Sequence, residues 1–431
     1  MKNNNKLNIA IVGLGNIGSY LYKYLQTNKE ILSKKNNCIP NVIFVSAKNR
    51  NKKRYIKINK KKWLKNYLDA TKSKNVDIIV ELIGGAEGAA KKLVFNALKN
   101  KKHVVTANKA LIAKYGDQLS KIAEKNKVNL EFEAAVCGGV PIIRSLKEGL
   151  IANKIIRVYG IFNGTSNYIL SSMDKENKSF KDVLIDAKRL GYAESNPLSD
   201  LNGDDVASKL KILSSLCFNS LIDHNIHVEG ISFIDKIDID NANKLGYKIK
   251  LLGVAETINN QIYQRVHPTL IKKTSYIASI DGVLNAVIVD GKPVGQNVIQ
   301  GEGAGPEATT SALISDISSI LRGNIKFPFS ISSKERKKLN YKGIAERSFS
   351  AYLRFEVLDK PGVLSNITNI FSKNKVSIKR LIQDPNKSKK SSSIIIITHN
   401  SKDKYLNKII KQIEKKSYIT KKPKLIRIGT N

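Results

Sequence analysis

The sequence predicts an α/β protein: a doubly wound parallel sheet comes first, a mixed α+β domain follows, and a small β-α-β-β-α-β module ends the chain. Three observations predict this order. Strand-like and helix-like segments alternate up to residue 135, a glycine-rich turn follows the first strand, and a new strand pattern starts at Phe349. At 431 residues the chain is long enough for two or three domains, each with its own core.

The first 135 residues contain short apolar runs typical of buried parallel strands. These runs are Leu7–Val12, Val42–Val45, Val76–Leu82, Val104–Thr106 and Val128–Phe132. Helical patterns lie between them at Ser19–Leu25, Gly88–Leu98 and Ala110–Asn126. Residues 28–40 and 49–62 are rich in Lys and Asn, and we expect surface loops there. Strands that alternate with helices imply right-handed crossovers and a parallel sheet.

The rest of the chain predicts a second domain, a polar linker at residues 323–347 and the final module. In the second domain we expect a strand at Ile155–Phe162 and helices at Phe180–Leu190 and Val206–Cys217. After a turn at Asp359–Gly362, the module is expected to contain a helix to Asn374, strands at Val376–Gln383 and Ser393–Thr398, and a helix at about Lys404–Lys415. The expected domains are 1–135 (completed by about 305–335), 136–320 and 348–427.

A glycine fingerprint, Gly13-Leu14-Gly15-Asn16-Ile17-Gly18, follows the first strand and opens a helix. Gly13 allows a tight turn, Gly15 lets the backbone approach a pyrophosphate, and Gly18 permits close packing of the helix on the strand. The helix N-terminus then holds the anion, with Asn16 and Ile17 in its first turn. This context predicts a Rossmann-type dinucleotide site. The alternative is a glycine turn that binds no ligand.

The residues after the second strand bear on the choice of dinucleotide. An NAD site usually has an acid there, but this strand ends Val45-Ser46-Ala47-Lys48-Asn49-Arg50, without one. Lys48 and Arg50 are suited to a 2′-phosphate, so the sequence favours NADPH, with NADH still possible. The alternative is that both are ordinary exposed bases in a lysine-rich chain.

A block at residues 191–209 places Glu194, Asp200, Asp204 and Asp205 just ahead of Lys209. We expect Asn202 or Asp204 to cap a helix on which Asp205 and Lys209, four residues apart, share one face. A lysine held beside carboxylates in a cleft can bind a small zwitterion and move a proton. The alternative is an exposed salt bridge after a polar loop, which is common and weak.

The net charge of +38 invites a nucleic-acid function, but the pattern of basic residues argues against it. They are mostly Lys, dispersed along the chain among many Asn and Ile, as expected from an AT-rich genome, and no arginine-rich tract or zinc finger is present. Cys38, Cys137 and Cys217 form no CxxC pair, which fits a reducing cytoplasm. The N-terminal apolar run is too short for a signal peptide or a membrane span, so we expect a soluble cytoplasmic protein.

Five ordered motifs resemble those of homoserine dehydrogenases that carry a C-terminal ACT domain. They are Glu81–Gly85, the Thr-Ala-Asn-Lys run at Thr106–Lys109, the Glu133–Pro141 turn, Gly160–Tyr168 and the Gly191–Lys209 block. The resemblance covers nearly the whole chain. Two positions depart from the family pattern: Gly88 stands where Pro is usual, and Ala308–Ser311 replaces a Pro-Thr-Ala-Ser run. These changes concern backbone stiffness near the cofactor more than charge.

The resemblance implies reversible hydride transfer between NAD(P)H and L-aspartate 4-semialdehyde, giving L-homoserine. It makes Lys209 the proton donor, Asp205 the group that orients the substrate or Lys209, and Lys109 a second lysine near nicotinamide and substrate. The usual lysine pKa of about 10 suits reduction, and burial is expected to lower the pKa of Lys209 toward the ~7–8 that serves both directions. For Lys109 the alternative is a surface lysine that caps a strand.

The same resemblance implies further contacts. Glu194 is expected to take the substrate ammonium with Asp200 close by, and Asn163 and Thr165 to line the pocket or only make turn hydrogen bonds. Further cofactor contacts are expected at Gly84, Thr106, Lys109 and Gly303. The family's structural sodium ion implies ligands from the backbone carbonyls of Glu133, Val136, Gly138 and Val140. His224 and His227 lack a third ligand, and Cys137 is interpreted as a packing residue.

The C-terminal motif Asp359-Lys360-Pro361-Gly362-Val363-Leu364, followed by Ile378 and Gln383, is similar to an ACT domain. Such modules pair edge to edge, so the resemblance implies a homodimer or tetramer in which a ligand can bridge two subunits. The effector expected for this family is L-threonine. The alternative is a module that serves only oligomerisation.

Two other functions stay open on the residues alone. One is a nucleotide-sensing regulator without turnover, and the other is a dehydrogenase of a different amino-acid aldehyde. A sensor need not keep Glu194, Asp205, Lys109 and Lys209 together, which argues against the first. The Gly191–Lys209 block argues against the second.

Overall fold

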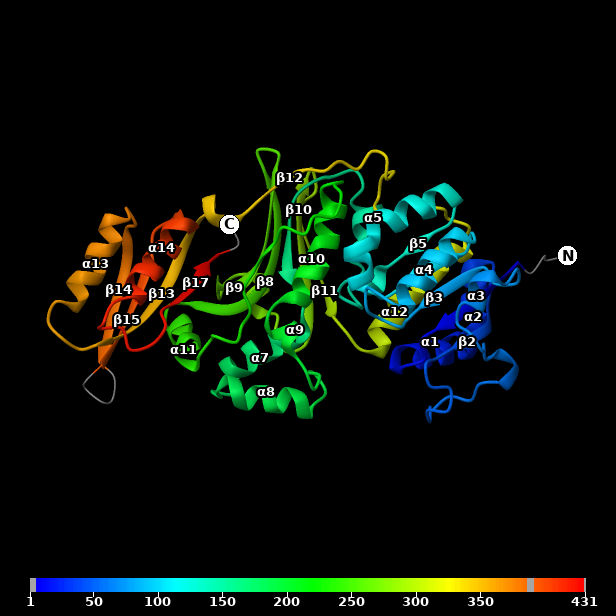
Figure 1. Cartoon of the computed structure of the whole chain (residues 1–431), viewed down its shortest axis with the longest axis horizontal. Helices are drawn as coiled ribbons and strands as arrows, with labels where there is room; N and C mark the ends of the chain where they lie inside the picture. Colours follow the sequence, from blue (N-terminus) through cyan, green and yellow to red (C-terminus); the bar gives the residue numbers. More distant parts are fainter. Residues whose placement is uncertain (1–4, 386–390, 430–431) are drawn as a thin grey trace.

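The computed structural model describes residues 5–385 and 391–429 and contains two sheets (Figure 1). The first sheet is parallel, in the order β2-β1-β3-β4-β5. Its strands are β1 (Lys6–Val12), β2 (Ile39–Ser46), β3 (Ile78–Glu81), β4 (His103–Thr106) and β5 (Leu130–Glu131). The chain reverses direction of winding between β1 and β3, where the carboxyl ends of parallel strands leave a crevice for ligands.

Helices cover both faces of this sheet because β1 is apolar on both sides. Ile9 and Ile11 pack under α1 (Asn16–Thr27), α2 (Lys29–Asn36) and α12 (Pro306–Leu321). Ala10 and Val12 face the opposite way, toward α4 (Ala89–Lys99) and α5 (Lys109–Asn126). A single turn, α3 (Asp69–Lys72), precedes β3. The five strands and three helices predicted for this region are therefore confirmed, with ends shifted by a few residues.

The prediction of a surface loop at residues 28–40 is wrong, because α2 occupies Lys29–Asn36. Lysine has a good helix propensity, so a lysine-rich stretch is no sign of a loop. Leu32 and Asn36 are buried, and Asn36 Nδ2 donates to Ser318 Oγ of α12 at 3.2 Å. Residues 49–62 are irregular as predicted, apart from a 3-10 turn at Lys60–Lys62.

The second sheet begins as an antiparallel array in the order β11-β10-β6-β8-β9. Its strands are β6 (Lys154–Ile161), β8 (Tyr247–Ile258), β9 (Gln261–Lys272), β10 (Leu284–Lys292) and β11 (Gly295–Glu302). Around it lie α6 (Ile142–Arg144), α7 (Gly164–Lys175), α8 (Phe180–Arg189), α9 (Leu198–Leu201), α10 (Asp204–Cys217) and α11 (Lys236–Lys244). The predicted strand and both predicted helices of this part are confirmed.

The C-terminal module has the predicted β-α-β-β-α-β order. Its elements are β13 (Ser348–Leu358), α13 (Val363–Lys373), β14 (Ile378–Pro385), β15 (Ser391–Thr398), α14 (Asp403–Glu414) and β17 (Lys424–Ile428), and the two-residue β16 (Ser401–Lys402) pairs with β13. The strands lie in the order β17-β13-β15-β14, so β14 is an edge strand. Apolar residues of the two helices pack on one face of this small sheet.

The module's sheet continues the second sheet, which the sequence did not predict. Strand β17 pairs in parallel with β9, with Arg427 opposite Thr269 and Ile428 opposite Leu270. The short strands β7 (His227–Val228) and β12 (Asn340–Lys342) also pair with β9. Figure 1 accordingly shows an elongated molecule with the first sheet near the N-terminus, the module at the far end and the second sheet between them. In the part of the chain that the structure describes, no helix is long and apolar enough to cross a membrane.

Candidate active site

The glycine fingerprint forms a tight turn between β1 and α1. Gly13 has a φ of +109°, and a Cβ there would lie 2.3 Å from the carbonyl oxygen of Leu82. A Cβ on Gly18 would lie 2.0 Å from the carbonyl oxygen of Gly13, whereas one on Gly15 would meet no atom within 4 Å. Gly13 and Gly18 are thus needed for packing, and Gly15 leaves open space at the first turn of α1. This geometry suits a bound pyrophosphate.

The basic residues after β2 are on the surface beside this turn. Lys48 and Arg50 are exposed, and the guanidinium of Arg50 lies 5.5 Å from the ring centre of Trp63. Arg54, which the sequence did not single out, lies 5.4 Å from the same ring, and its Nε donates to the carbonyl of Leu14 at 3.0 Å. A second guanidinium therefore lies against the fingerprint itself.

A buried carboxylate organises the loop after β3. Glu81 is fully buried and accepts hydrogen bonds from the N–H groups of Ile83 and Gly84, at 2.7 and 3.0 Å, and from Thr106 Oγ1 at 2.6 Å. Asn108 Nδ2 donates to the carbonyl of Gly85 at 2.7 Å. Thr106 is therefore buried behind the loop and holds it through Glu81. Gly84, with a φ of +84°, is exposed at the surface of the loop.

Gly88 ends this loop with a φ of +68°. Proline is held near −65°, so the Pro that is usual in the family cannot adopt this conformation. The glycine therefore permits a backbone conformation at the start of α4 that proline could not adopt, and the charge of the loop is the same with either residue.

Two lysines from distant parts of the chain meet at Asp205. Lys109 Nζ lies 3.0 Å from Asp205 Oδ1, and Lys209 Nζ lies 2.8 Å from Asp205 Oδ2. Lys209 Nζ also donates to the carbonyl of Phe162 at 2.5 Å. The Asp205 and Lys209 side chains are buried, but that of Lys109 is 41% exposed. An exposed i,i+4 salt bridge, the alternative for this pair, is thus excluded.

The charges in this cluster hold one another in the ionised form. Burial raises the pKa of Asp205, but the ammonium groups of Lys209 and Lys109 outweigh it and hold that pKa well below its usual range. For Lys209, burial lowers the pKa, but the negative charge of Asp205 outweighs burial and raises the pKa above its usual value. The expectation that burial lowers the pKa of Lys209 toward neutrality is therefore wrong.

The predicted cap of α10 is also wrong. Neither Asn202 nor Asp204 caps this helix; Gly203 occupies the N-cap position with a φ of +87°. A Cβ on Gly203 would lie 3.1 Å from methyl groups of both Val228 and Val266, so the helix starts where the chain packs tightly on β9.

Asn163 extends the cluster toward Asp200. Its Nδ2 donates to Asp205 Oδ2 at 2.9 Å and to Asp200 Oδ1 at 2.8 Å, while its Oδ1 caps α7 by accepting the N–H of Ser166 at 2.7 Å. Thr165 Oγ1 donates to the carbonyl of Tyr192 at 2.6 Å and so ties the 191–197 loop to α7. Glu194 is exposed on that loop, and within the described residues no hydrogen bond or ion pair links it to the cluster.

The turn at Glu133–Val140 lies against the Gly301–Gly305 segment. The N–H of Gly139 donates to the carbonyl of Glu302 at 2.9 Å, and a Cβ on Gly138 would lie 2.7 Å from the carbonyl oxygen of Gly303. The carboxylate of Glu133 accepts the N–H groups of Ile143 and Arg144, and burial raises its pKa to about 7.

Two of the predicted ligand carbonyls in this turn, those of Glu133 and Val140, already accept one backbone N–H each, from Val136 and Ile142. Within the described residues no group of three His, Cys, Asp or Glu side chains could hold a metal ion. An ion in this turn would therefore depend on backbone carbonyl oxygens. Cys137 is buried, and burial raises the pKa of its thiol to about 11, as expected for a packing residue.

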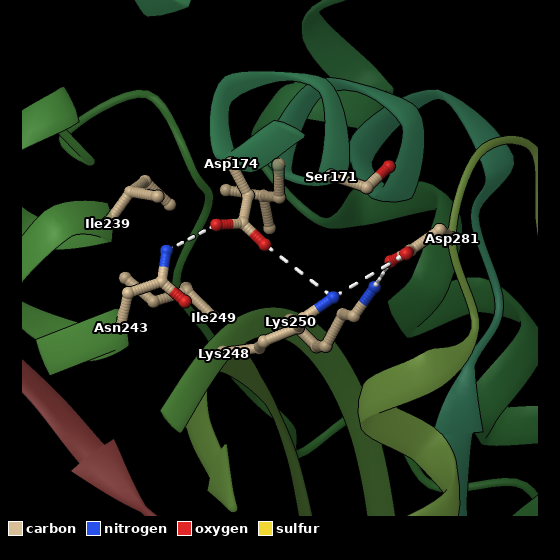
Figure 2. A pocket seen from close by; sticks show the side chains of 9 residues that line it. Ser171, Asp174, Ile239, Asn243, Lys248, Ile249, Lys250 and Asp281 are labelled. Atoms are coloured by element: carbon tan, nitrogen blue, oxygen red, sulfur yellow. Dashed lines mark hydrogen bonds and ion pairs between the residues drawn. The ribbon is translucent and has the colours of Figure 1, made fainter. Parts of the chain in front are cut away.

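A second polar cluster, shown in Figure 2, contains none of the predicted site residues. Buried Lys250 on β8 contacts Asp281 Oδ1 at 2.8 Å and Asn167 Oδ1 at 3.0 Å, and burial lowers its pKa. Lys248 lies 3.6 Å from Asp174 and 3.5 Å from Asp281. The cavity between them measures about 10 Å³, room for about one water molecule. The cluster therefore fixes α7 against β8 and leaves no space for a substrate.

Comparisons with known proteins fit this geometry. Residues 13–133 match the family described as homoserine dehydrogenase, NAD binding domain, and residues 141–318 match the family described as homoserine dehydrogenase. A homoserine dehydrogenase of Neisseria gonorrhoeae is 38% identical, covering 98% of this chain and 98% of its own length. One of Helicobacter pylori is 39% identical, covering 98% and 99%. The chain belongs to the homoserine dehydrogenase family.

The family membership extends to the whole fold. The crystal structure of a homoserine dehydrogenase from Thiobacillus denitrificans superposes with a TM-score of 0.91 at 37% identity, over 99% of this chain and 98% of that one. Residues 353–421 match an AHAS small subunit-like ACT domain. The predicted fold class is thereby confirmed. The chain is an oxidoreductase with a nicotinamide cofactor, and the non-enzymatic sensor and the other aldehyde dehydrogenase are not supported.

Three residues of this homoserine dehydrogenase site were missed as functional residues in the sequence: Arg54, Glu81 and Asn108. Glu81 gave a usable signal, because an ionisable residue ended an apolar strand ahead of a glycine pair. Asn108 also gave a signal, because it directly precedes the helix at Lys109 in the N-cap position that favours Asn. Arg54 gave none, since it lies among many lysines in a polar loop.

Proposed function

We propose that this chain catalyses the reversible reduction of L-aspartate 4-semialdehyde to L-homoserine with Lys209 as the proton donor. The observation that carries the proposal is the Lys109–Asp205–Lys209 cluster, in which a buried, protonated lysine is held in place by a carboxylate and by the Phe162 carbonyl. Lys109 follows β4 at the carboxyl edge of the sheet that carries the glycine fingerprint, which brings the cluster to the cofactor side.

Lys209 has the charge and the protons that the reduction needs. A bound nicotinamide supplies the hydride to the aldehyde carbon. As negative charge grows on the aldehyde oxygen, the Lys209 ammonium stabilises it and donates a proton from Nζ. Its raised pKa keeps the donor protonated at neutral pH. In the reverse direction the neutral amine takes the hydroxyl proton, which favours homoserine oxidation at higher pH.

The surrounding residues position the reactants. Asp205 fixes the Lys209 ammonium, and Lys109 shares that carboxylate while its exposed side directs positive charge toward the cofactor crevice. Asp200, held by Asn163, and Glu194 on its open loop are suited to the substrate α-ammonium. Thr165 sets the position of that loop through Tyr192, so Asn163 and Thr165 act mainly by arranging the pocket wall.

For the cofactor we propose NADPH in preference to NADH. Gly13, Gly15, Asn16, Ile17 and Gly18 would hold the pyrophosphate, and Gly84, Lys109 and Gly303 would line the remainder of the cofactor path. Thr106, which is fully buried, would support this path from behind through its hydrogen bond to Glu81. Lys48, Arg50 and the added Arg54 put positive charge where a 2′-phosphate would lie, and the strand before them ends without an acid.

We also propose a structural Na⁺ ion bound by the carbonyls of Glu133, Val136, Gly138 and Val140. The positive φ angles of Cys137 and Gly138 turn this segment sharply, and a carbonyl that accepts one N–H keeps a second lone pair for a cation. Hard monovalent cations prefer oxygen ligands of this kind. The ion would hold the turn against the Gly301–Gly305 segment near the cofactor.

L-Threonine is the effector we propose for the ACT module, at the Asp359–Gly362 turn. Gly362 is the N-cap of α13 with a φ of +83°, and no side chain caps this helix. The N–H of Val363 donates to the Lys360 carbonyl at 3.4 Å, so the N–H groups that follow it in the first turn are the ones suited to a carboxylate. The edge strand β14 offers unpaired backbone groups for a second subunit, consistent with a homodimer or tetramer. The cytoplasm is the compartment we propose.

The test is NADPH oxidation by the purified chain with L-aspartate 4-semialdehyde, repeated with NADH and in the presence of L-threonine. We expect turnover, faster with NADPH, and slower turnover when threonine is added. A folded protein that binds NADPH but does not turn over would contradict the proposed reaction.

A further inference from the structure

A hollow of about 810 Å³ lies where three parts of the chain meet. His227 and Gln264 line it from β7 and β9, Tyr341–Ala345 from the segment that leads into the ACT module, and one face of α14 from the module itself. This volume is in the range of small-molecule sites. The hollow lies near the pairing of β17 with β9. This is the edge of the module's sheet opposite to the edge strand β14.

The lining is strongly cationic. It contains Lys342, Lys404, Lys408 and Lys411 against a single carboxylate, Asp403. Asp403 is already paired, because Arg427 Nε lies 2.7 Å from its Oδ1, and Lys404 pairs with Glu346 at 2.7 Å. Lys342, Lys408 and Lys411 form no ion pair with any residue in 5–385 or 391–429.

Three of these lysines lie on one helix. The lining residues of α14 are Asp403, Lys404, Asn407, Lys408 and Lys411, which share one face of the helix. The helix dipole favours an anion only at the first turn, whereas Lys411 lies in the last turn. The positive potential of this face therefore comes from the lysine side chains.

A buried amide in the wall provides an independent observation. Gln264 is 2% exposed, and its Nε2 makes only a long contact of 3.5 Å with the carbonyl of Asn225. Its Oε1 has no hydrogen-bond partner among the described residues. A buried acceptor left unpaired is unfavourable by about 1–3 kcal/mol, and a hydroxyl or amine of a ligand would satisfy it.

We propose that this hollow binds a small organic oxyanion with two or more negative charges and a hydroxyl group. The lysines take the charged oxygens, and a rotation of the Gln264 side chain would bring its unpaired Oε1 to the ligand hydroxyl. A ligand held in this way links α14 of the ACT module to β9 and to the connecting segment. It is a second effector site, separate from the Asp359–Gly362 turn and independent of the reaction proposed above.

Calorimetric titration of the full chain with citrate and, separately, with glycerol 3-phosphate tests this site. Excess NADPH fills the nucleotide site, and ionic strength is held constant. We expect saturation at one ligand per chain with at least one of the two. Citrate alone would assign the site to polycarboxylates, and glycerol 3-phosphate alone to phosphate esters. Saturation with neither overturns the proposal.

A matched pair of variants separates the hollow from general surface charge. Lys408→Gln/Lys411→Gln removes two lining charges and should weaken binding by about tenfold or more. Lys415→Gln/Lys416→Gln removes two exposed charges just beyond the end of α14 and should change binding by less than about twofold. Equal weakening in both variants overturns the site.

Hydrogen exchange gives a readout that does not depend on the variants. With the ligand bound, the amides of residues 341–345 and 403–411 should exchange more slowly in the wild-type chain. Protection confined to the glycine fingerprint or to the surroundings of Lys209 contradicts the proposal.

Discussion

At the scale of single residues, Asp205 determines the charge that Lys209 carries in the site. It is buried between Lys109 and Lys209, and both ammonium groups lie within ion-pair distance of its oxygens. Burial lowers the pKa of Lys209 and the charge of Asp205 raises it, so removal of this carboxylate would favour the neutral amine. A proton donor for reduction thus depends on a residue that need not touch the aldehyde.

The variant Asp205→Asn should displace the pH dependence of both reaction directions. Reduction uses the protonated lysine and is lost as pH rises through its pKa, so the loss should come about one pH unit or more earlier than in the wild type. Homoserine oxidation needs the neutral amine and should therefore start at lower pH. Rate profiles against pH in both directions measure this effect.

The matched control is Asp204→Asn, which changes an exposed carboxylate in the same helical turn. Its profiles should follow those of the wild type. A profile of Asp205→Asn that does not move, or an equal displacement in Asp204→Asn, contradicts the role given to Asp205.

The sequence predicted only part of this cluster. Asp205 and Lys209 are four residues apart, so helical periodicity alone placed them together. Lys109 is far away in the chain, and its contact with Asp205 follows only from the packing of α5 beside α10. The pKa direction of Lys209 was missed because spacing does not reveal that burial and the paired charge act on the same atom.

At the scale of elements, the glycine fingerprint divides into packing and binding positions. Gly15→Ala should keep the unfolding free energy within about 1 kcal/mol, since its Cβ meets no atom within 4 Å. It should weaken NADPH binding by about tenfold or more, because the methyl group fills the space left for the pyrophosphate. Fluorescence titration of NADPH and urea unfolding measure the two effects.

Gly18→Ala is the comparison, since its Cβ would lie 2.0 Å from the Gly13 carbonyl oxygen. It should lose about 2 kcal/mol or more of unfolding free energy. The division fails if Gly15→Ala is the less stable of the two, or if it binds NADPH as tightly as the wild type.

The turn before α13 supports a second prediction at this scale. Gly362→Asp should raise the threonine concentration needed for half-inhibition by about tenfold or more, because its carboxylate would repel the effector carboxylate at the helix N-terminus. Asp tolerates the left-handed backbone of this position, and a Cβ there meets no atom within 4 Å. Turnover without threonine should not change.

Gly362→Asn is the uncharged control and should retain most of the inhibition. Inhibition curves of the wild type and of both variants decide the matter. If Gly362→Asp is inhibited like the wild type, the assignment of this turn to threonine is wrong.

Elements with strong periodicity were predictable, and those fixed by distant contacts were not. The helix at Val206–Cys217 was found within two residues, but its start at Gly203 depends on close packing against β9. Helix α2 was missed because only Leu32 and Asn36 of its lysine-rich sequence are buried, too few to show an apolar stripe.

At the scale of the whole molecule, one sheet joins the catalytic part to the ACT module. Strand β17 pairs with β9, and fully buried Arg427 links Glu229 of the second domain at 2.8 Å to Asp403 at the start of α14 at 2.7 Å. Strand pairing between β9 and β17 joins residues far apart in the sequence, and neither strand carries a signal for its partner. This is why the sequence predicted a separate module.

Arg427→Met should destabilise both parts together. It leaves Glu229 and Asp403 without their shared cation, a loss of about 3 kcal/mol or more for a buried pair. We expect a lower unfolding midpoint in urea and a weaker response to threonine, because the seam between module and sheet loosens. The control Lys421→Met removes an exposed charge from the same segment and should do neither. A variant as stable as the wild type contradicts the importance of the seam.

The most direct test of the account is turnover and NADPH affinity of Lys209→Met, with Lys211→Met as the control on the same helix. We predict that Lys209→Met lowers kcat for aspartate 4-semialdehyde reduction by about 10²- to 10⁴-fold while the Kd for NADPH stays within about twofold. Lys211→Met should keep both values. Turnover by Lys209→Met close to that of the control would contradict Lys209 as the proton donor.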